Sequence, residues 1–92
     1  MIRLSSRPRL SPKVRLRFDR RTGHDLLLYP ETGLDLNETA AKIARLCTGE
    51  NAVEDIVHHL ALIYDDVPST IIEQDVNAFL NALAERGLLR SE

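Results

Sequence analysis

The stretch VRLRFDRRTGHDLLLYPETGLDLNETAAKIARLC, residues 14–47, decides the fold, because its apolar spacing changes once along its length. Residues 14–19 alternate apolar with polar side chains, which is the period of a half-buried strand. From Leu36 onward, apolar residues recur every three or four positions, which is the period of a helix. The sequence therefore predicts strands first and helices after them.

Three short strands are expected before the change of period, at residues 14–19, 26–29 and 34–36. The first turn, Arg20–Gly23, ends in a glycine that is free to adopt positive φ. The second turn is expected at Pro30–Gly33. Short connections of this kind join antiparallel neighbours, so the three strands form a meander whose last strand is an edge.

Three helices are expected after residue 36, because each candidate segment carries start or stop signals at its ends. The third segment repeats apolar residues at helical spacing between Ile72 and Leu83. Leu88 and Leu89 follow it and can fold back onto the core. The expected boundary residues are Asn37 and Gly49 for the first helix, Asn51 with Glu54 as a capping box for the second, and Ser69, Thr70 with Glu73, and Gly87 for the third. The predicted fold class is α+β, a winged helix-turn-helix-like arrangement of a three-stranded antiparallel sheet followed by three helices.

The 92 residues leave room for one domain. Residues 1–12 are predicted to be an N-terminal arm, because Pro8 and Pro12 disfavour regular structure, and residues 13–92 a single domain. No apolar run is long enough to cross a bilayer. With Cys47 as the only cysteine, no disulfide forms within the chain, so a cytoplasmic location is expected.

Charge is divided unevenly along the chain. Residues 1–21 hold eight basic side chains and one acidic one, whereas the remainder holds four basic and thirteen acidic ones. A basic segment of this kind fits a nucleic acid, an acidic partner, or attraction to the acidic half of the chain itself. A winged-helix DNA-binding regulator is therefore the alternative function. Residues 69–86, however, contain three acidic residues and a single basic one, Arg86, and would be repelled by phosphate.

The sequence contains no recognisable catalytic motif. Cys47 lies on the apolar stripe of the first expected helix, where a buried, unreactive thiol is expected. His58 and His59 are adjacent, so on a helix they point about 100° apart and do not share a metal ion. We therefore expect no enzyme activity, no metal site and no cofactor.

An exposed edge strand beside an amphipathic helix is a binding site of another kind. An extended peptide can add to such an edge as a further strand, with its side chains in the neighbouring groove. The edge could instead be covered by residues 1–12, or it could pair with a second copy of the chain. Both a monomer and a homodimer remain open.

The chain resembles the PqqD family over residues 8–90. The segments that carry the resemblance are Pro8–Leu10, Val14–Asp19, Gly23 with Leu27–Glu31, Leu36–Ile43, Leu46–Glu50, Ile56–Val57, Asp75–Val76, Phe79–Leu80 and Arg86–Leu89. Position 52 holds Ala where a threonine-like helix cap would suit the pattern, which shifts the expected cap to Asn51.

The resemblance implies a peptide chaperone. Proteins of this family bind the precursor peptide PqqA and present it to the radical S-adenosylmethionine enzyme PqqE in the biosynthesis of pyrroloquinoline quinone. In such recognition elements the leader part of the peptide lies along the third strand, against the third helix. Whether the quinone product also binds stays open.

Mapped onto this chain, the resemblance places the peptide between one strand and one helix face. The implied peptide-binding residues are Thr32, Gly33, Leu34, Asp35 and Leu36 on the strand, and Ile72, Asp75, Val76, Phe79, Leu80 and Leu83 on the helix. Some of these apolar residues must belong to the core, and the sequence does not separate the two sets.

Overall fold

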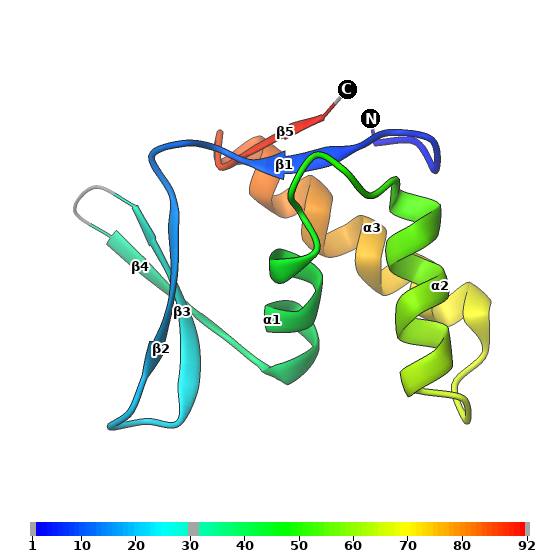
Figure 1. The fold of residues 1–92 in the computed structure, drawn as a ribbon, viewed down its shortest axis with the longest axis horizontal. Helices are drawn as coiled ribbons and strands as arrows, with labels where there is room; N and C mark the ends of the chain where they lie inside the picture. Colours follow the sequence, from blue (N-terminus) through cyan, green and yellow to red (C-terminus); the bar gives the residue numbers. More distant parts are fainter. Residues whose placement is uncertain (1, 30–31, 92) are drawn as a thin grey trace.

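A three-stranded sheet lies beside a group of three helices, and a second, two-stranded sheet crosses the helices (Figure 1). The computed structural model describes residues 2–29 and 32–91. The elements follow in the order β1 (Pro8–Leu10), β2 (Arg15–Asp19), β3 (His24–Tyr29), β4 (Thr32–Leu36), α1 (Glu38–Arg45), α2 (Val53–Ile63), α3 (Ser69–Glu85) and β5 (Leu89–Ser91). The prediction of a meander followed by three helices is confirmed.

The larger sheet has the strand order β2-β3-β4, with both pairs antiparallel. Leu16, Leu27 and Leu34 stand opposite one another across the three strands, so they share one face. Leu27 is fully buried, which identifies this face as the one that packs against the helices. Among the described residues β4 pairs only with β3, as expected for an edge strand.

Two details of the sheet differ from the prediction. The middle strand begins at His24 rather than at Leu26, because β2 pairs with it as far as Asp19. Phe18 is 57% exposed although it follows the alternation of β2. Residues 30 and 31 of the expected turn Pro30–Gly33 lie outside the described residues, and the other two belong to β4.

The smaller sheet corrects the prediction that residues 1–12 lack regular structure. Pro8–Leu10 forms β1 and pairs antiparallel with β5. Pro8 is compatible with this arrangement because it is the first residue of its strand, where a missing N–H is tolerated. The N–H of Ser11 donates to the carbonyl of Leu88 at 2.9 Å and thereby extends the contact. The segment is thus bound to the rest of the chain by backbone hydrogen bonds.

Helix α1 begins as predicted and ends earlier than predicted. The Asn37 side chain accepts a hydrogen bond of 2.8 Å from the N–H of Ala40, as an N-cap does. The helix ends at Arg45 and not next to Gly49, because the carbonyl of Cys47 accepts the N–H of Leu10 and turns the chain toward β1. Gly49 instead adopts a φ of 87° in the following loop.

The predicted capping boxes of the other two helices are wrong. At α2 the Asp55 carboxylate accepts the N–H of Ala52 at 2.9 Å, while Asn51 donates back to the carbonyl of Leu46 at 3.0 Å. Asn51 therefore satisfies the end of α1 rather than the start of α2. At α3 the cap position is Pro68 and no side chain caps the helix, so Thr70 lies within the first turn.

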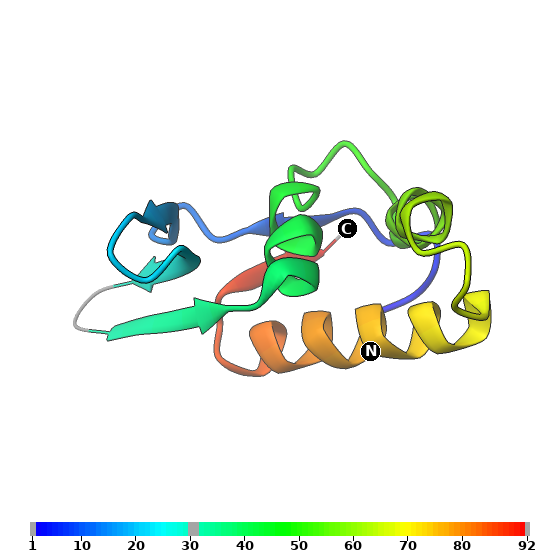
Figure 2. The same cartoon turned by 90° about the horizontal axis from the view of Figure 1, so that it is seen from below.

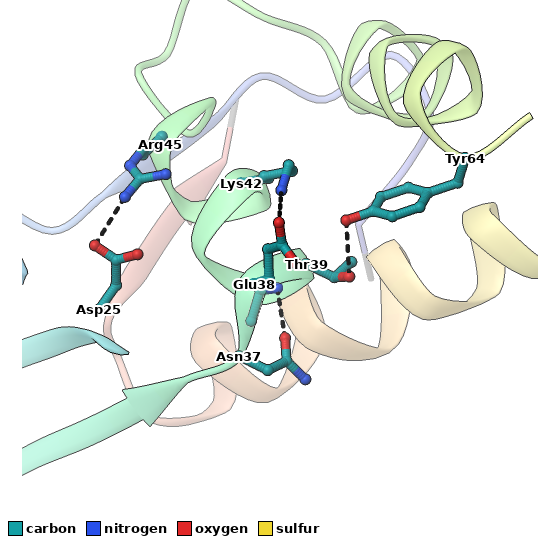
Figure 3. A network of polar contacts seen from close by, with 8 residues as sticks. Asp25, Asn37, Glu38, Thr39, Lys42, Arg45 and Tyr64 are labelled. Carbon is teal, nitrogen blue, oxygen red and sulfur yellow. Dashed lines mark hydrogen bonds and ion pairs between the residues drawn. The ribbon is translucent and has the colours of Figure 1, made fainter. Parts of the chain in front are cut away.

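The helices bury one continuous core between themselves and the sheet. Figure 2 shows α3, in orange to yellow, running beneath α1 and α2. The largest fully buried side chains of this core are Leu27, Ile43, Val53, Ile56, Leu60, Val76, Leu80 and Leu83. Arg45 pairs with Asp25 at 2.8 Å and so ties α1 to β3 (Figure 3). Gly87 follows α3 with a φ of 72°, and Leu88 and Leu89 return to the core as predicted.

None of the helices in residues 2–29 and 32–91 combines the length and the apolar character that crossing a membrane requires.

Candidate functional site

A groove lies between β4 and the C-terminal half of α3. Its volume is about 310 Å³. The strand side is formed by β4 and the residues that lead into α1, and the helix side by one stripe of α3. The lining residues are Leu34, Asp35, Leu36, Asn37, Ala40, Phe79, Ala82, Leu83 and Arg86. It lies in the region where the resemblance to the PqqD family places the peptide, and we call it the β4 groove.

The structure divides the eleven expected site residues into three groups by burial. Five are buried, namely Leu36, Ile72, Val76, Leu80 and Leu83, and all belong to the hydrophobic core. Leu34 and Phe79 are half-buried, and Thr32, Gly33, Asp35 and Asp75 are exposed. Leu34 and Phe79 are therefore the apolar side chains that a ligand in the β4 groove can reach, since both lie at the edge of the core and line the groove.

Four groove residues escaped the sequence reasoning: Asn37, Ala40, Ala82 and Arg86. A signal for two of them was present. Ala82 and Arg86 follow Phe79 at i+3 and i+7, so they share its face of α3. Nothing in the sequence marks Ala40 as a binding residue, and Ala82 is marked only by its spacing from Phe79. Their small side chains project little from the helices and so leave the groove open.

The exposed edge of β4 borders the groove. An edge strand presents backbone N–H and C=O groups that pair with nothing in its own sheet. Gly33 lies in this strand, and a Cβ placed there would come within 3.2 Å of the Leu28 side chain. Glycine thus lets the strand lie close to β3 at that point. The site combines free backbone groups with a partly apolar groove beside them.

Among the described residues, neither the cysteine nor the adjacent histidines line the β4 groove. Cys47 is 4% exposed, its thiol donates to the carbonyl of Ile43, and burial raises its pKa to about 12. The thiol is therefore protonated at neutral pH, as expected for a structural cysteine. His58 and His59 are exposed on α2. Across residues 2–29 and 32–91, no three His, Cys, Asp or Glu side chains gather as metal ligands would.

A separate surface hollow lies at the end of the sheet where β2 turns into β3. Its volume is about 590 Å³. We call it the arginine-rich face. Its residues are Arg17, Phe18, Asp19, Arg20, Arg21, Leu26 and Leu28. Asp19 lies 3.7 Å from Arg21, which leaves a net positive surface around apolar side chains. It shares no residue with the β4 groove.

Comparison with known proteins gives this architecture a family. The family model described as Coenzyme PQQ synthesis protein D (PqqD) matches residues 26–89. A PqqA binding protein of Methylococcus capsulatus is 37% identical over 81 residues, which are 88% of this chain and 84% of that protein. The bifunctional coenzyme PQQ synthesis protein C/D of Methylorubrum extorquens is 40% identical over 82 residues; the match covers 89% of this chain and only 22% of that longer protein.

Solved structures agree with the sequence matches. The PqqD part of Methylobacterium extorquens PqqCD, described as a functional and stand-alone RiPP recognition element (one that recognises ribosomally made, modified peptides), superposes with a TM-score of 0.77 at 38% identity. The match covers 90% of this chain and 87% of that one. A lasso peptide synthetase B1 complexed with its leader peptide superposes with a TM-score of 0.78 at 27% identity, covering 91% and 98%. On the family match and these relatives, the chain belongs to the PqqD family.

Proposed function

We propose that this chain is a peptide-recognition module that binds the precursor peptide PqqA in pyrroloquinoline quinone biosynthesis and performs no chemistry itself. The observation that carries the proposal is the free edge of β4 beside the β4 groove. Relatives of this chain are named PqqA binding proteins, and a similar fold is known in complex with a leader peptide. These likenesses favour a peptide over the DNA alternative, which they do not support.

The energetics of strand addition are adequate for specific binding. A five-residue edge offers about four outward-facing backbone groups, and each new hydrogen bond contributes about 0.5–1.5 kcal/mol net. One or two apolar peptide side chains against Leu34 and Phe79 add about 1.5–3 kcal/mol each. The total offsets the cost of ordering the peptide and supports an affinity of about micromolar.

The test is an NMR titration of the ¹⁵N-labelled chain with synthetic PqqA. Amide shifts are expected to concentrate in residues 32–36 and 79–86, because these segments contain the β4 edge and the α3 side of the groove. A peptide of the same composition in scrambled order is the control and should leave the spectrum unchanged. The proposal fails if PqqA produces no shifts at millimolar concentration, or if the shifts centre on α2.

We propose further that the module works in the cytoplasm and delivers the peptide to PqqE through the arginine-rich face. The free thiol of Cys47 is compatible with a reducing compartment. The face is separate from the β4 groove, so a partner can bind there while the peptide is held. Its mixture of arginines with the exposed Phe18 suits an acidic protein surface that also contributes apolar contacts.

Charge reversal tests this second partner. The double variant Arg17→Glu, Arg20→Glu is expected to weaken the complex with purified PqqE at least about tenfold in biolayer interferometry, with PqqA affinity unchanged. Arg3→Glu, Arg7→Glu makes the same charge change elsewhere and is the matched control. If both double variants weaken PqqE binding equally, the effect comes from net charge alone and the assignment fails. Undiminished PqqE binding by the Arg17→Glu, Arg20→Glu variant would also contradict it.

A further inference from the structure

The β4 groove continues beyond the end of β4. A second hollow of about 270 Å³ lies between the start of α1 and the middle of α3, and it shares Asn37, Ala40 and Phe79 with the β4 groove. A third, of about 120 Å³, shares Thr39, Ile43 and Asp75 with the second. The three hollows therefore form one path along α3. We call the third hollow the Tyr64 pocket.

The path has a length that an extended peptide can follow. On the α3 side, its lining residues run from Arg86, the residue that follows α3, back to Ile72. At about 1.5 Å per residue this is about 21 Å. An extended chain rises about 3.3 Å per residue, so about six residues cover this distance. A peptide paired with β4 reaches the Tyr64 pocket within a few residues of passing Leu36.

The Tyr64 pocket is apolar with one charge at its boundary. Its walls include the side chains of Ile43, Leu60, Val67 and Ile72. Its volume approaches the roughly 150 Å³ of an apolar cavity that admits benzene, so it holds a side chain of moderate size. Among the described residues, Asp75 is the one charged residue that lines either this pocket or the second hollow. It forms no ion pair within residues 2–29 and 32–91, which leaves its carboxylate available.

Tyr64 and Thr39 add polar groups that can respond to a ligand. Figure 3 shows the Tyr64 ring reaching from the end of α2 toward α1, where the Thr39 hydroxyl donates to the Tyr64 oxygen. This bond is 3.3 Å long, well beyond the usual 2.7–2.8 Å of a hydroxyl pair. It is weak enough to be exchanged for a bond to an entering group. Lys42 lies 5.9 Å from the Tyr64 ring but is paired with Glu38, so it does not neutralise Asp75.

From this arrangement we propose that the Tyr64 pocket takes a lysine or arginine side chain of the bound peptide, from the flank that runs past Leu36. The aliphatic stem lies against the apolar walls and the cationic end pairs with Asp75, as long basic side chains do at apolar surfaces. The inference rests on the proposed function and deepens it, since it fixes the chemistry of one peptide position and the end of the groove at which it binds.

Charge variants of Asp75 test the proposal with synthetic PqqA in isothermal titration calorimetry. Asp75→Asn is expected to weaken binding about threefold and Asp75→Lys about tenfold, and both effects should shrink as salt increases. Glu85→Lys makes the same charge change on α3 outside the three hollows and should leave the affinity unchanged. Equal losses for Asp75→Lys and Glu85→Lys, or none for either Asp75 variant, would overturn the inference.

Peptide variants then identify the residue. Each lysine and arginine of PqqA is replaced in turn by methionine. For one of these peptides, the Asp75→Asn substitution should no longer change the binding affinity. The same peptide should no longer shift the NMR signals of Tyr64 and Val67, while it still shifts those of β4. If every replacement leaves the Tyr64 and Val67 shifts in place, the pocket does not hold a basic residue, although the proposed function stands. If wild-type protein shows no binding at all, the proposed function itself fails and takes this inference with it.

Discussion

Replacing Asp35 by proline is expected to weaken PqqA binding at least about 30-fold while the domain stays folded. Tyr29 and Thr32 pair across a two-residue connection, which makes them a hydrogen-bonded pair of the β3–β4 ladder. Alternation then directs the N–H of Leu34 toward β3 and the N–H of Asp35 toward the open edge. Proline at position 35 removes an outward donor and places its ring where the peptide strand must approach. Two or three hydrogen bonds of about 1 kcal/mol each are lost.

Calorimetry with PqqA measures this effect, and circular dichroism checks the fold. Asp35→Ala keeps the N–H and should bind nearly as well as the parent chain, which separates the backbone from the side chain. Phe18→Pro changes an outward-facing position on the opposite edge of the same sheet and should also leave the peptide affinity intact. Undiminished binding by a folded Asp35→Pro chain would exclude strand addition to β4.

Leu80→Ala is expected to lower the free energy of unfolding by about 2–5 kcal/mol, whereas Phe79→Ala lowers peptide affinity instead. The two residues are neighbours on α3, yet Leu80 is fully buried and Phe79 lines the β4 groove. Truncating Leu80 leaves a cavity within the core, in a domain whose total stability is about 5–15 kcal/mol. Truncating Phe79 removes an apolar contact worth about 1.5–3 kcal/mol to a ligand, or about tenfold or more in affinity.

Urea denaturation and calorimetry with PqqA together separate the two roles. We expect a large fall in the urea midpoint for Leu80→Ala and a small one for Phe79→Ala. At a temperature where both variants are folded, we expect the opposite for peptide affinity: a large loss for Phe79→Ala and a small one for Leu80→Ala. If Phe79→Ala binds PqqA like the parent chain, the β4 groove is not where apolar peptide side chains dock.

The comparison of these two residues also shows where sequence reasoning stopped. Helical spacing placed both Phe79 and Leu80 on the apolar side of α3. That side faces the core over part of its width and the β4 groove over the rest. Periodicity gives the direction of a side chain around its own helix, but not which neighbouring elements lie against that side. The position of β4 across the groove from the C-terminal half of α3 is what separates core from groove.

Local signals were reliable where the deciding contact is local. Asn37 caps α1 and Gly87 ends α3 because each acts on residues within one turn of itself. The error at Pro8 has the opposite origin, because Pro8–Leu10 becomes a strand through pairing with residues 89–91, and so distant a partner leaves little trace in a short window of sequence. The error at Asn51 is one of direction within a local signal. Its side chain bonds backward to the carbonyl of Leu46, five residues earlier, instead of forward to the start of α2.

The pairing of β1 with β5 has a consequence for modular use of the fold. It places Pro8 opposite Ser91, so the C-terminal end of the described chain leaves from a small sheet that contains no strand of the β2-β3-β4 sheet. At the N-terminal end, residues 2–7 run from the same sheet to the start of α2, where the carbonyls of Leu4 and Ser6 accept hydrogen bonds from the backbone. Neighbouring polypeptide can be joined at either end without passing over the β4 edge. The related segment within the bifunctional protein C/D is such a natural fusion. Affinity tags, fluorescent reporters or an entire enzyme can accordingly be attached at these ends while the β4 edge stays accessible.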